Sequence, residues 1–64
     1  MIEVLLRQGD SGDLVNQVIT SLNRIGLLHS NPDNYDESVV AAVALFQQQR
    51  GLTSTGNVNN QTFQ

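Results

Sequence analysis

The chain has 64 residues, no cysteine, six acidic residues and three arginines, which give a formal net charge of −3. A chain of this length forms one small domain with roughly 3–5 kcal/mol of net stability, and without cysteine it has no disulfide, thiolate metal site or cysteine nucleophile. Three arginines spread along the sequence do not form the basic face that binding to phosphates requires, so we expect no nucleic-acid partner.

Targeting and membrane signals are missing from the sequence. The longest uninterrupted apolar run, residues 39–46, is far too short to span a bilayer, so no membrane partner is expected. The first thirty residues hold no basic stretch followed by an apolar run, so they do not form a signal peptide. Two expectations follow: a cytoplasmic protein, or a single domain, residues 1–64, that is a fragment of a longer exported protein located in the cell envelope or outside the cell.

The first predicted elements are an extended segment and a helix. Ile2 to Leu6 is apolar and is expected to pack in an extended conformation. A helix is predicted from Ser11 to Ile25, with Asp10 or Ser11 as its N-cap and Gly26 as its C-cap. Its apolar residues recur at helical spacing and are expected to face the core. They are Leu14, Val15, Val18, Ile19, Leu22 and Ile25.

A second helix is predicted from Asp36, as its N-cap, to Arg50, with Gly51 as its stop. Asn59 could cap a further helix that carries Thr62 and Phe63. The expected fold class is therefore all-α, a small three-helix orthogonal bundle whose third helix is short or truncated. Besides the first helix, the predicted core contains Leu6, Leu27, Tyr35, Val39, Ala42, Val43, Phe46, Leu52 and Val58.

The two predicted helices resemble each other in sequence. Val15, Ile19 and Leu22, followed by Gly26-Leu27, are echoed by Val39, Val43 and Phe46, followed by Gly51-Leu52. A repeated order of apolar helix, glycine and leucine predicts stacked helical units that share one core.

Three blocks of residues carry motifs of a known family. They are Leu6-Arg7, Gly9, Gly12, Val15, Leu22 and Gly26, then Ala42-Val43, Phe46-Gln47 and Gly51-Leu52, then Gly56, Val58 and Thr62. In order and spacing they resemble the type 1 peptidoglycan-binding domain of bacterial cell-wall amidases and related hydrolases. The resemblance implies a non-catalytic, monomeric module without a cofactor that binds peptidoglycan or muropeptides. It also implies a tethered catalytic domain, in the first instance an N-acetylmuramoyl-L-alanine amidase.

Five positions depart from the family pattern. They are Ile19, Asn34, Asp36, Val39 and Asn59. Asn34 stands where the family has glycine, and asparagine is the next residue best able to adopt a left-handed turn. Because of these departures, a protein-interaction or regulatory module of the same fold is kept as the alternative to peptidoglycan binding.

Gln47 has two interpretations. On the helical wheel it borders the core, so its amide could bond to loop backbone, which is the more frequent role of such amides. It could instead face a shallow groove formed by the end of the second helix and the loop after it. The groove hypothesis offers donors and acceptors to a neutral glycopeptide at a low desolvation cost. Its candidate ligand-binding residues are Arg7, Gln8, Gln47, Arg50, Asn57 and Asn59.

A self-sufficient enzyme is the third and weakest hypothesis. The chain has one histidine, His29, whereas a zinc site needs three or four ligands and a serine triad needs an orienting third group and an oxyanion hole. We therefore expect no catalytic residue and no metal site.

Overall fold

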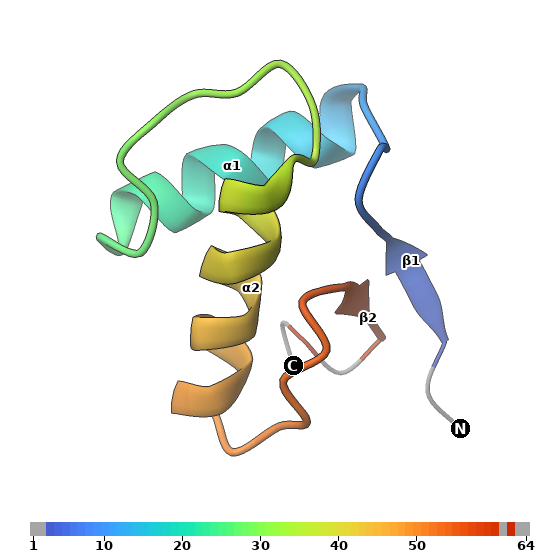
Figure 1. Cartoon of the computed structure of the whole chain (residues 1–64), viewed down its shortest axis with the longest axis vertical. Coiled ribbons are helices and arrows are strands. Elements are labelled where there is room, and N and C mark those ends of the chain that lie inside the picture. The colour runs from blue at the N-terminus through green and yellow to red at the C-terminus, as the bar shows by residue number, and fades with distance from the viewer. Residues whose placement is uncertain (1–2, 61, 63–64) are drawn as a thin grey trace.

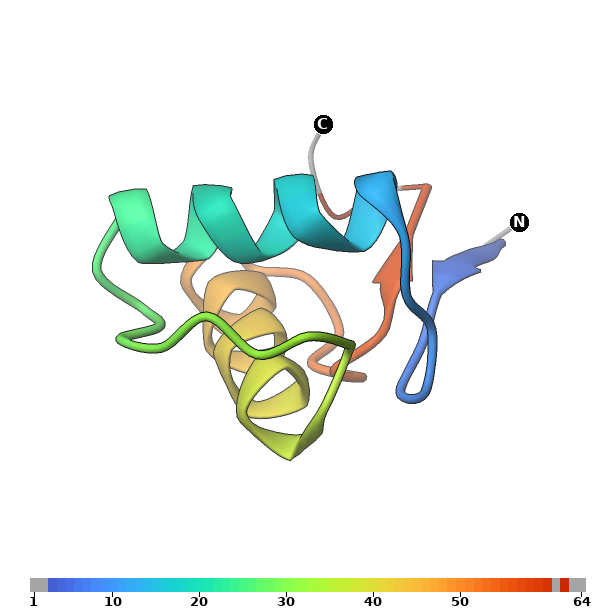
Figure 2. The same ribbon diagram turned by 90° about the horizontal axis from the view of Figure 1, so that it is seen from above.

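The computed structural model describes residues 3–60 and 62. Its elements in chain order are β1 (Val4–Leu6), α1 (Asp13–Arg24), α2 (Glu37–Gln49) and β2 (Val58–Asn59). The two helices cross instead of lying side by side, and the strands pair beside the crossing (Figure 1). A view from above shows α1 lying across α2, which is seen nearly end-on (Figure 2). Within the described residues, neither helix has the length and apolar character that crossing a membrane requires.

The two helices start in different ways. Asp36 is the N-cap of α2, as predicted, and its carboxylate accepts hydrogen bonds from the N–H groups of Ser38 (3.0 Å) and Val39 (3.2 Å). The N-cap of α1 is Gly12, which makes no side-chain capping bond, so the prediction of Asp10 or Ser11 is wrong. The Asp10 carboxylate instead accepts from the Arg7 N–H at 3.0 Å and closes the turn after β1.

Both helices end in the same motif, which the internal similarity of the sequence indicated. Gly26 and Gly51 follow the C-caps with φ of 82° and 74°. Each glycine N–H donates to the carbonyl three residues earlier, at 3.1 Å in both helices. The N–H of the next residue, Leu27 or Leu52, donates to the carbonyl five residues earlier, at 3.0 Å and 2.8 Å. This pair of bonds is the Schellman motif, and its left-handed residue explains the glycines.

The core lies between α1 and α2 and is closed by the loop segments and β2. Most of the predicted residues are in it, but Leu14 and Ile25, at the two ends of the predicted apolar face, are exposed. Phe46 is partly buried at the edge of the core. Leu28, which was not predicted, is buried where the chain turns back after α1. The buried apolar residues are Val15, Val18, Ile19, Leu22, Leu28, Tyr35, Val39, Ala42, Val43 and Val58.

The third helix is not confirmed. Asn59, its predicted N-cap, belongs to β2, and the described residues contain two helices and one strand pair. Phe63 lies outside the described residues. The all-α class therefore holds only broadly, because the chain near residue 59 forms a sheet with the N-terminal segment.

The strands β1 and β2 are antiparallel. Val4 lies opposite Asn59, and Leu6 lies opposite Val58, with an irregularity between the two pairs. Next to the strands, the Asn60 N–H donates to the Glu3 carbonyl at 3.1 Å. These partners are more than fifty residues apart, so no local sequence pattern announces their pairing.

Candidate functional site

Gln47 is the hub of a buried hydrogen-bond network at the end of α2. Its side chain is fully buried, and its Oε1 accepts from the N–H groups of Thr55 (2.9 Å) and Gly56 (3.0 Å). Its Nε2 donates to the Asn57 carbonyl at 2.8 Å. The amide thus holds the loop between α2 and β2 in place. This is the first of its two interpretations, in which Gln47 bonds to loop backbone. Gln47 does not face a groove, because no part of its side chain reaches the surface.

Tyr35 also bonds to the loop between α2 and β2. Its ring is fully buried, and its hydroxyl donates to the Gly56 carbonyl at 2.6 Å. Burial raises the pKa of the Tyr35 hydroxyl to about 12, so the hydroxyl stays a donor at any physiological pH. Gly56 has a φ of +79°, and a Cβ there would lie 2.7 Å from Cγ1 of Val40. Tyr35, Gly56 and Gln47 therefore form the frame of the domain.

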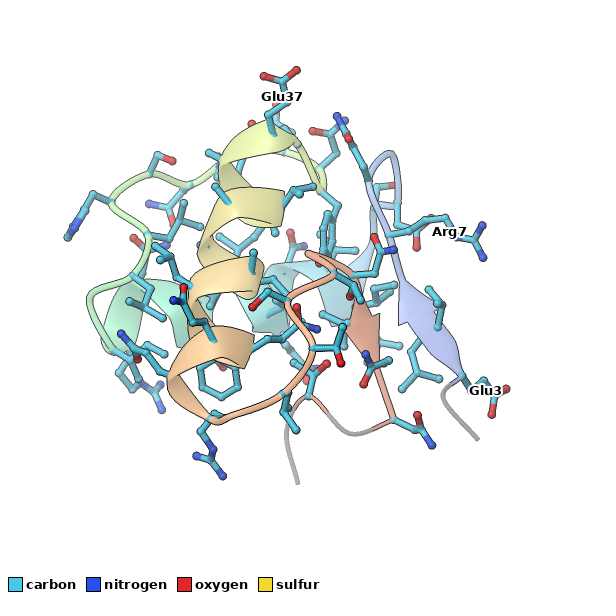
Figure 3. The ribbon with its side chains drawn as sticks, turned by 60° about the horizontal axis from the view of Figure 1, so that its bottom comes forward. Glu3, Arg7 and Glu37 are labelled. Carbon is cyan, nitrogen blue, oxygen red and sulfur yellow. The ribbon has the colours of Figure 1, made fainter. Side chains whose placement is uncertain are left out.

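Of the six predicted ligand-binding residues, Gln47, Asn57 and Asn59 meet in the network after α2, because Gln47 bonds to the Asn57 carbonyl and shares the Thr62 hydroxyl with the Asn59 N–H. Arg7 and Gln8 are exposed after β1, and Arg7 extends away from both helices (Figure 3). Arg50 is exposed beyond α2, with its guanidinium carbon 5.6 Å from the centre of the Phe46 ring. Asn57 is half-buried and Asn59 is buried. None of the six lines either of the two pockets along α1.

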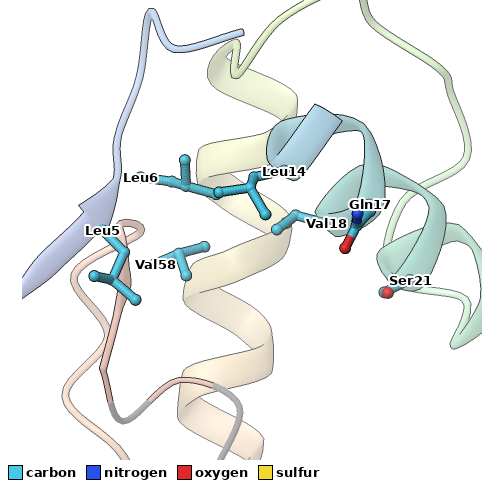
Figure 4. A pocket seen from close by; sticks show the side chains of 7 residues that line it. All are labelled: Leu5, Leu6, Leu14, Gln17, Val18, Ser21 and Val58. Carbon is cyan, nitrogen blue, oxygen red and sulfur yellow. The ribbon is translucent and has the colours of Figure 1, made fainter. Parts of the chain in front are cut away.

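A groove lies between the strands and α1. Its volume is about 280 Å³. Apolar side chains from three elements converge on it (Figure 4), and Gln17 and Ser21 follow along α1. We call it the α1–β1 groove, and its apolar lining consists of Leu5 and Leu6 from β1, Leu14 and Val18 from α1, and Val58 from β2.

The exposed leucines of the α1–β1 groove distinguish it from the core. Leu14 is 64 % exposed and Leu5 is 57 % exposed, although both are large and apolar. The helical spacing predicted Leu14 in the core, but Leu14 lies at the edge of the apolar face of its helix, and the structure leaves it exposed beside β1.

A polar surface continues from this groove along α1. Gln17 and Ser21 line both the groove and the polar surface, so the two are contiguous. We call this surface the polar strip, and its residues are Asp13, Asn16, Gln17, Thr20, Ser21 and Arg24. Its amides and hydroxyls can donate and accept hydrogen bonds, and it has an acid at one end and a base at the other.

Within residues 3–60 and 62, no group of three or more metal-ligating side chains gathers anywhere.

Comparison with protein families identifies what kind of domain this is. A family model described as "Putative peptidoglycan binding domain" matches residues 11–64. The chain belongs to this family. The matched region of the peptidoglycan-binding domain includes both helices, the Gln47 network and β2, whereas β1 precedes it. A search of the curated proteins and a search of the solved structures each gave no match.

The structure explains the family motifs that the sequence shares. Gln47 and Gly56 belong to the frame, and Gly26 and Gly51 end the helices. These positions therefore define the fold of the peptidoglycan-binding domain.

Proposed function

We propose that this domain is a non-catalytic module that binds peptidoglycan and holds an attached cell-wall hydrolase at its substrate. The match of residues 11–64 to a peptidoglycan-binding family carries the proposal. An N-acetylmuramoyl-L-alanine amidase is the attached enzyme that we favour. Such a tether needs only weak intrinsic affinity, because confinement at the cell wall raises the local concentration of the enzyme. The proposed setting is the cell envelope or the exterior of the cell, with the module acting as a monomer in a longer exported protein.

Polar side chains on the surface support binding to a glycopeptide that is rich in hydroxyl and amide groups and carries few charges. Arg7, Gln8 and Arg50 are exposed and stay candidates for contacts with the glycopeptide. Few charges carry such binding, so the affinity should be modest and should change little with salt. Protein binding through basic patches would instead weaken steeply as salt is added.

Co-sedimentation with purified insoluble peptidoglycan tests the proposal. We expect the domain to pellet with peptidoglycan and not with cellulose, at both low and high sodium chloride concentrations. Cellulose is the control because it offers sugar hydroxyls without N-acetyl groups or peptides. A domain that stays in the supernatant with every matrix would contradict peptidoglycan binding and favour the protein-interaction module.

A further inference from the structure

The α1–β1 groove and the polar strip together form one continuous amphipathic surface. The groove offers apolar side chains such as Leu5, Leu14 and Val58, and none of its lining residues is charged. The strip offers amides and hydroxyls and ends at Arg24, in the last turn of α1. A ligand that matches this surface is apolar at the groove, amide-rich along Gln17 and Ser21, and anionic at Arg24, with its carboxylate kept away from Asp13 at the other end of the strip.

We propose that this surface binds the muramyl-peptide junction of peptidoglycan, where N-acetylmuramic acid is joined to L-alanine and D-glutamate. The acetyl, lactyl and alanyl methyl groups of the junction lie in the α1–β1 groove. Its amides bond to Gln17 and Ser21, and the glutamate carboxylate pairs with Arg24. This inference rests on the proposed peptidoglycan binding and names the part of the polymer that is recognised.

Charge and length both favour this occupant. Burying methyl groups in an uncharged apolar groove is favourable, because it removes apolar surface from water. A carboxylate placed there would lose its hydration without a charged or hydrogen-bonding partner. Ser21 precedes Arg24 by three residues, about 4.5 Å of helix axis, and one extended peptide residue spans about 3.3–3.6 Å. One to two residues of the stem peptide therefore span the step from Ser21 to Arg24 along the helix.

The inference is tested by titrating N-acetylmuramyl-L-alanyl-D-glutamate into the ¹⁵N-labelled domain. We expect the largest backbone shift changes at Leu5, Leu6, Gln17, Val18 and Ser21. Shift changes concentrated instead in the loop after α2, or absent at millimolar ligand, would overturn the assignment.

Two matched leucine variants test the contact itself. Leu14→Ala removes an apolar side chain of the groove, and Leu45→Ala removes one from the exposed face of α2. Both side chains are mainly exposed, at 64 % and 48 %, so neither variant should unfold the domain. Leu14→Ala should weaken binding roughly five- to tenfold, in line with the methyl groups removed, and Leu45→Ala should leave it unchanged. Equal affinities for the two variants would overturn the inference.

The anionic end is tested by changing both partners. Arg24→Gln should weaken binding of N-acetylmuramyl-L-alanyl-D-glutamate but not of N-acetylmuramyl-L-alanine amide, which lacks the glutamate carboxylates. An equal effect on the two ligands would overturn the pairing of Arg24 with the carboxylate.

Co-sedimentation with insoluble peptidoglycan separates failure of this inference from failure of the proposed function. If the wild-type domain and Leu14→Ala pellet equally, the domain binds peptidoglycan at another surface and the groove assignment is wrong. If the wild-type domain does not pellet, peptidoglycan binding itself is wrong, and the groove assignment falls with it.

Discussion

Replacing Gln47 by alanine should unfold most of the domain at room temperature. The substitution strands the buried N–H of Gly56, which costs about 1–3 kcal/mol, and it removes hydrogen bonds to Thr55 and Asn57 worth about 0.5–1.5 kcal/mol each. These terms sum to about 2–6 kcal/mol before the cavity left by the side chain is counted, so the loss is comparable to the whole net stability of roughly 3–5 kcal/mol expected at this chain length.

Gln48→Ala is the matched control for this prediction. Gln48 is the next residue of α2 and is exposed, so its loss should change the free energy of unfolding by no more than about 0.5 kcal/mol. Urea unfolding followed by far-ultraviolet circular dichroism measures both variants. A Gln47→Ala domain that unfolds with the midpoint and slope of the wild type would refute the role of the network.

Gln47→Glu adds a test that depends on pH. The ionised carboxylate keeps an acceptor for Thr55 and Gly56 but faces the Asn57 carbonyl without a proton to donate. Burial raises the pKa of the introduced carboxyl above its value in the unfolded chain. The variant should therefore approach wild-type stability below the unfolded pKa and lose stability as pH rises through the folded pKa. A stability difference from the wild type that is the same at pH 4 and pH 7 would contradict this account.

Three further predictions concern the frame and the start of α2. Gly56→Ala should lower the free energy of unfolding by about 2–4 kcal/mol in urea unfolding, because its Cβ meets Val40 at a positive φ; an unchanged midpoint would contradict this. Tyr35→Phe should cost about 1–3 kcal/mol by leaving the Gly56 carbonyl without its donor, and ultraviolet titration of the wild type should show Tyr35 ionising near pH 12. At Asp36, hydrogen bonds from Ser38 lower the pKa of the carboxyl, so the stabilising cap is present above the unfolded pKa and lost as pH falls through the folded pKa. Asp36→Ala should therefore destabilise the domain at neutral pH and match the wild type more closely in acid. Asp36→Asn keeps an uncharged cap, so its stability should depend less on pH. Thermal melts at neutral and acidic pH measure both variants.

The parts of the fold that follow from near neighbours in sequence could be predicted. Asp36 caps α2, and Gly26 and Gly51 end the helices, because each feature depends on a few consecutive residues. The start of α1 was placed wrongly, since Asp10 was drawn into the turn after β1 instead of capping the helix. In that case a competing local hydrogen bond decided the outcome.

The candidate site was harder to predict because it depends on contacts between distant segments. The position of Gln47 at the edge of the core followed from the helical wheel, but only the fold shows that Thr55 and Gly56 occupy its amide. The α1–β1 groove exists because β1 pairs with β2 and brings Leu5 and Leu6 close to Leu14. No periodic pattern in the sequence predicts that these leucines lie close together.

The pairing of β1 with β2 also determines what fraction of the time the α1–β1 groove is formed. The hydrogen bonds from the Gly9 N–H to the Tyr35 carbonyl and from the Tyr35 hydroxyl to the Gly56 carbonyl already hold the two strands near each other, so pairing Leu6 with Val58 closes only short segments. The pairing itself gains little stability, because Leu5 stays largely exposed and the strands are short. We therefore expect the β1 side of the α1–β1 groove to open more readily than α1. A molecule that touches both sides would hold the strands together, so occupancy of the groove and closure of the chain reinforce each other.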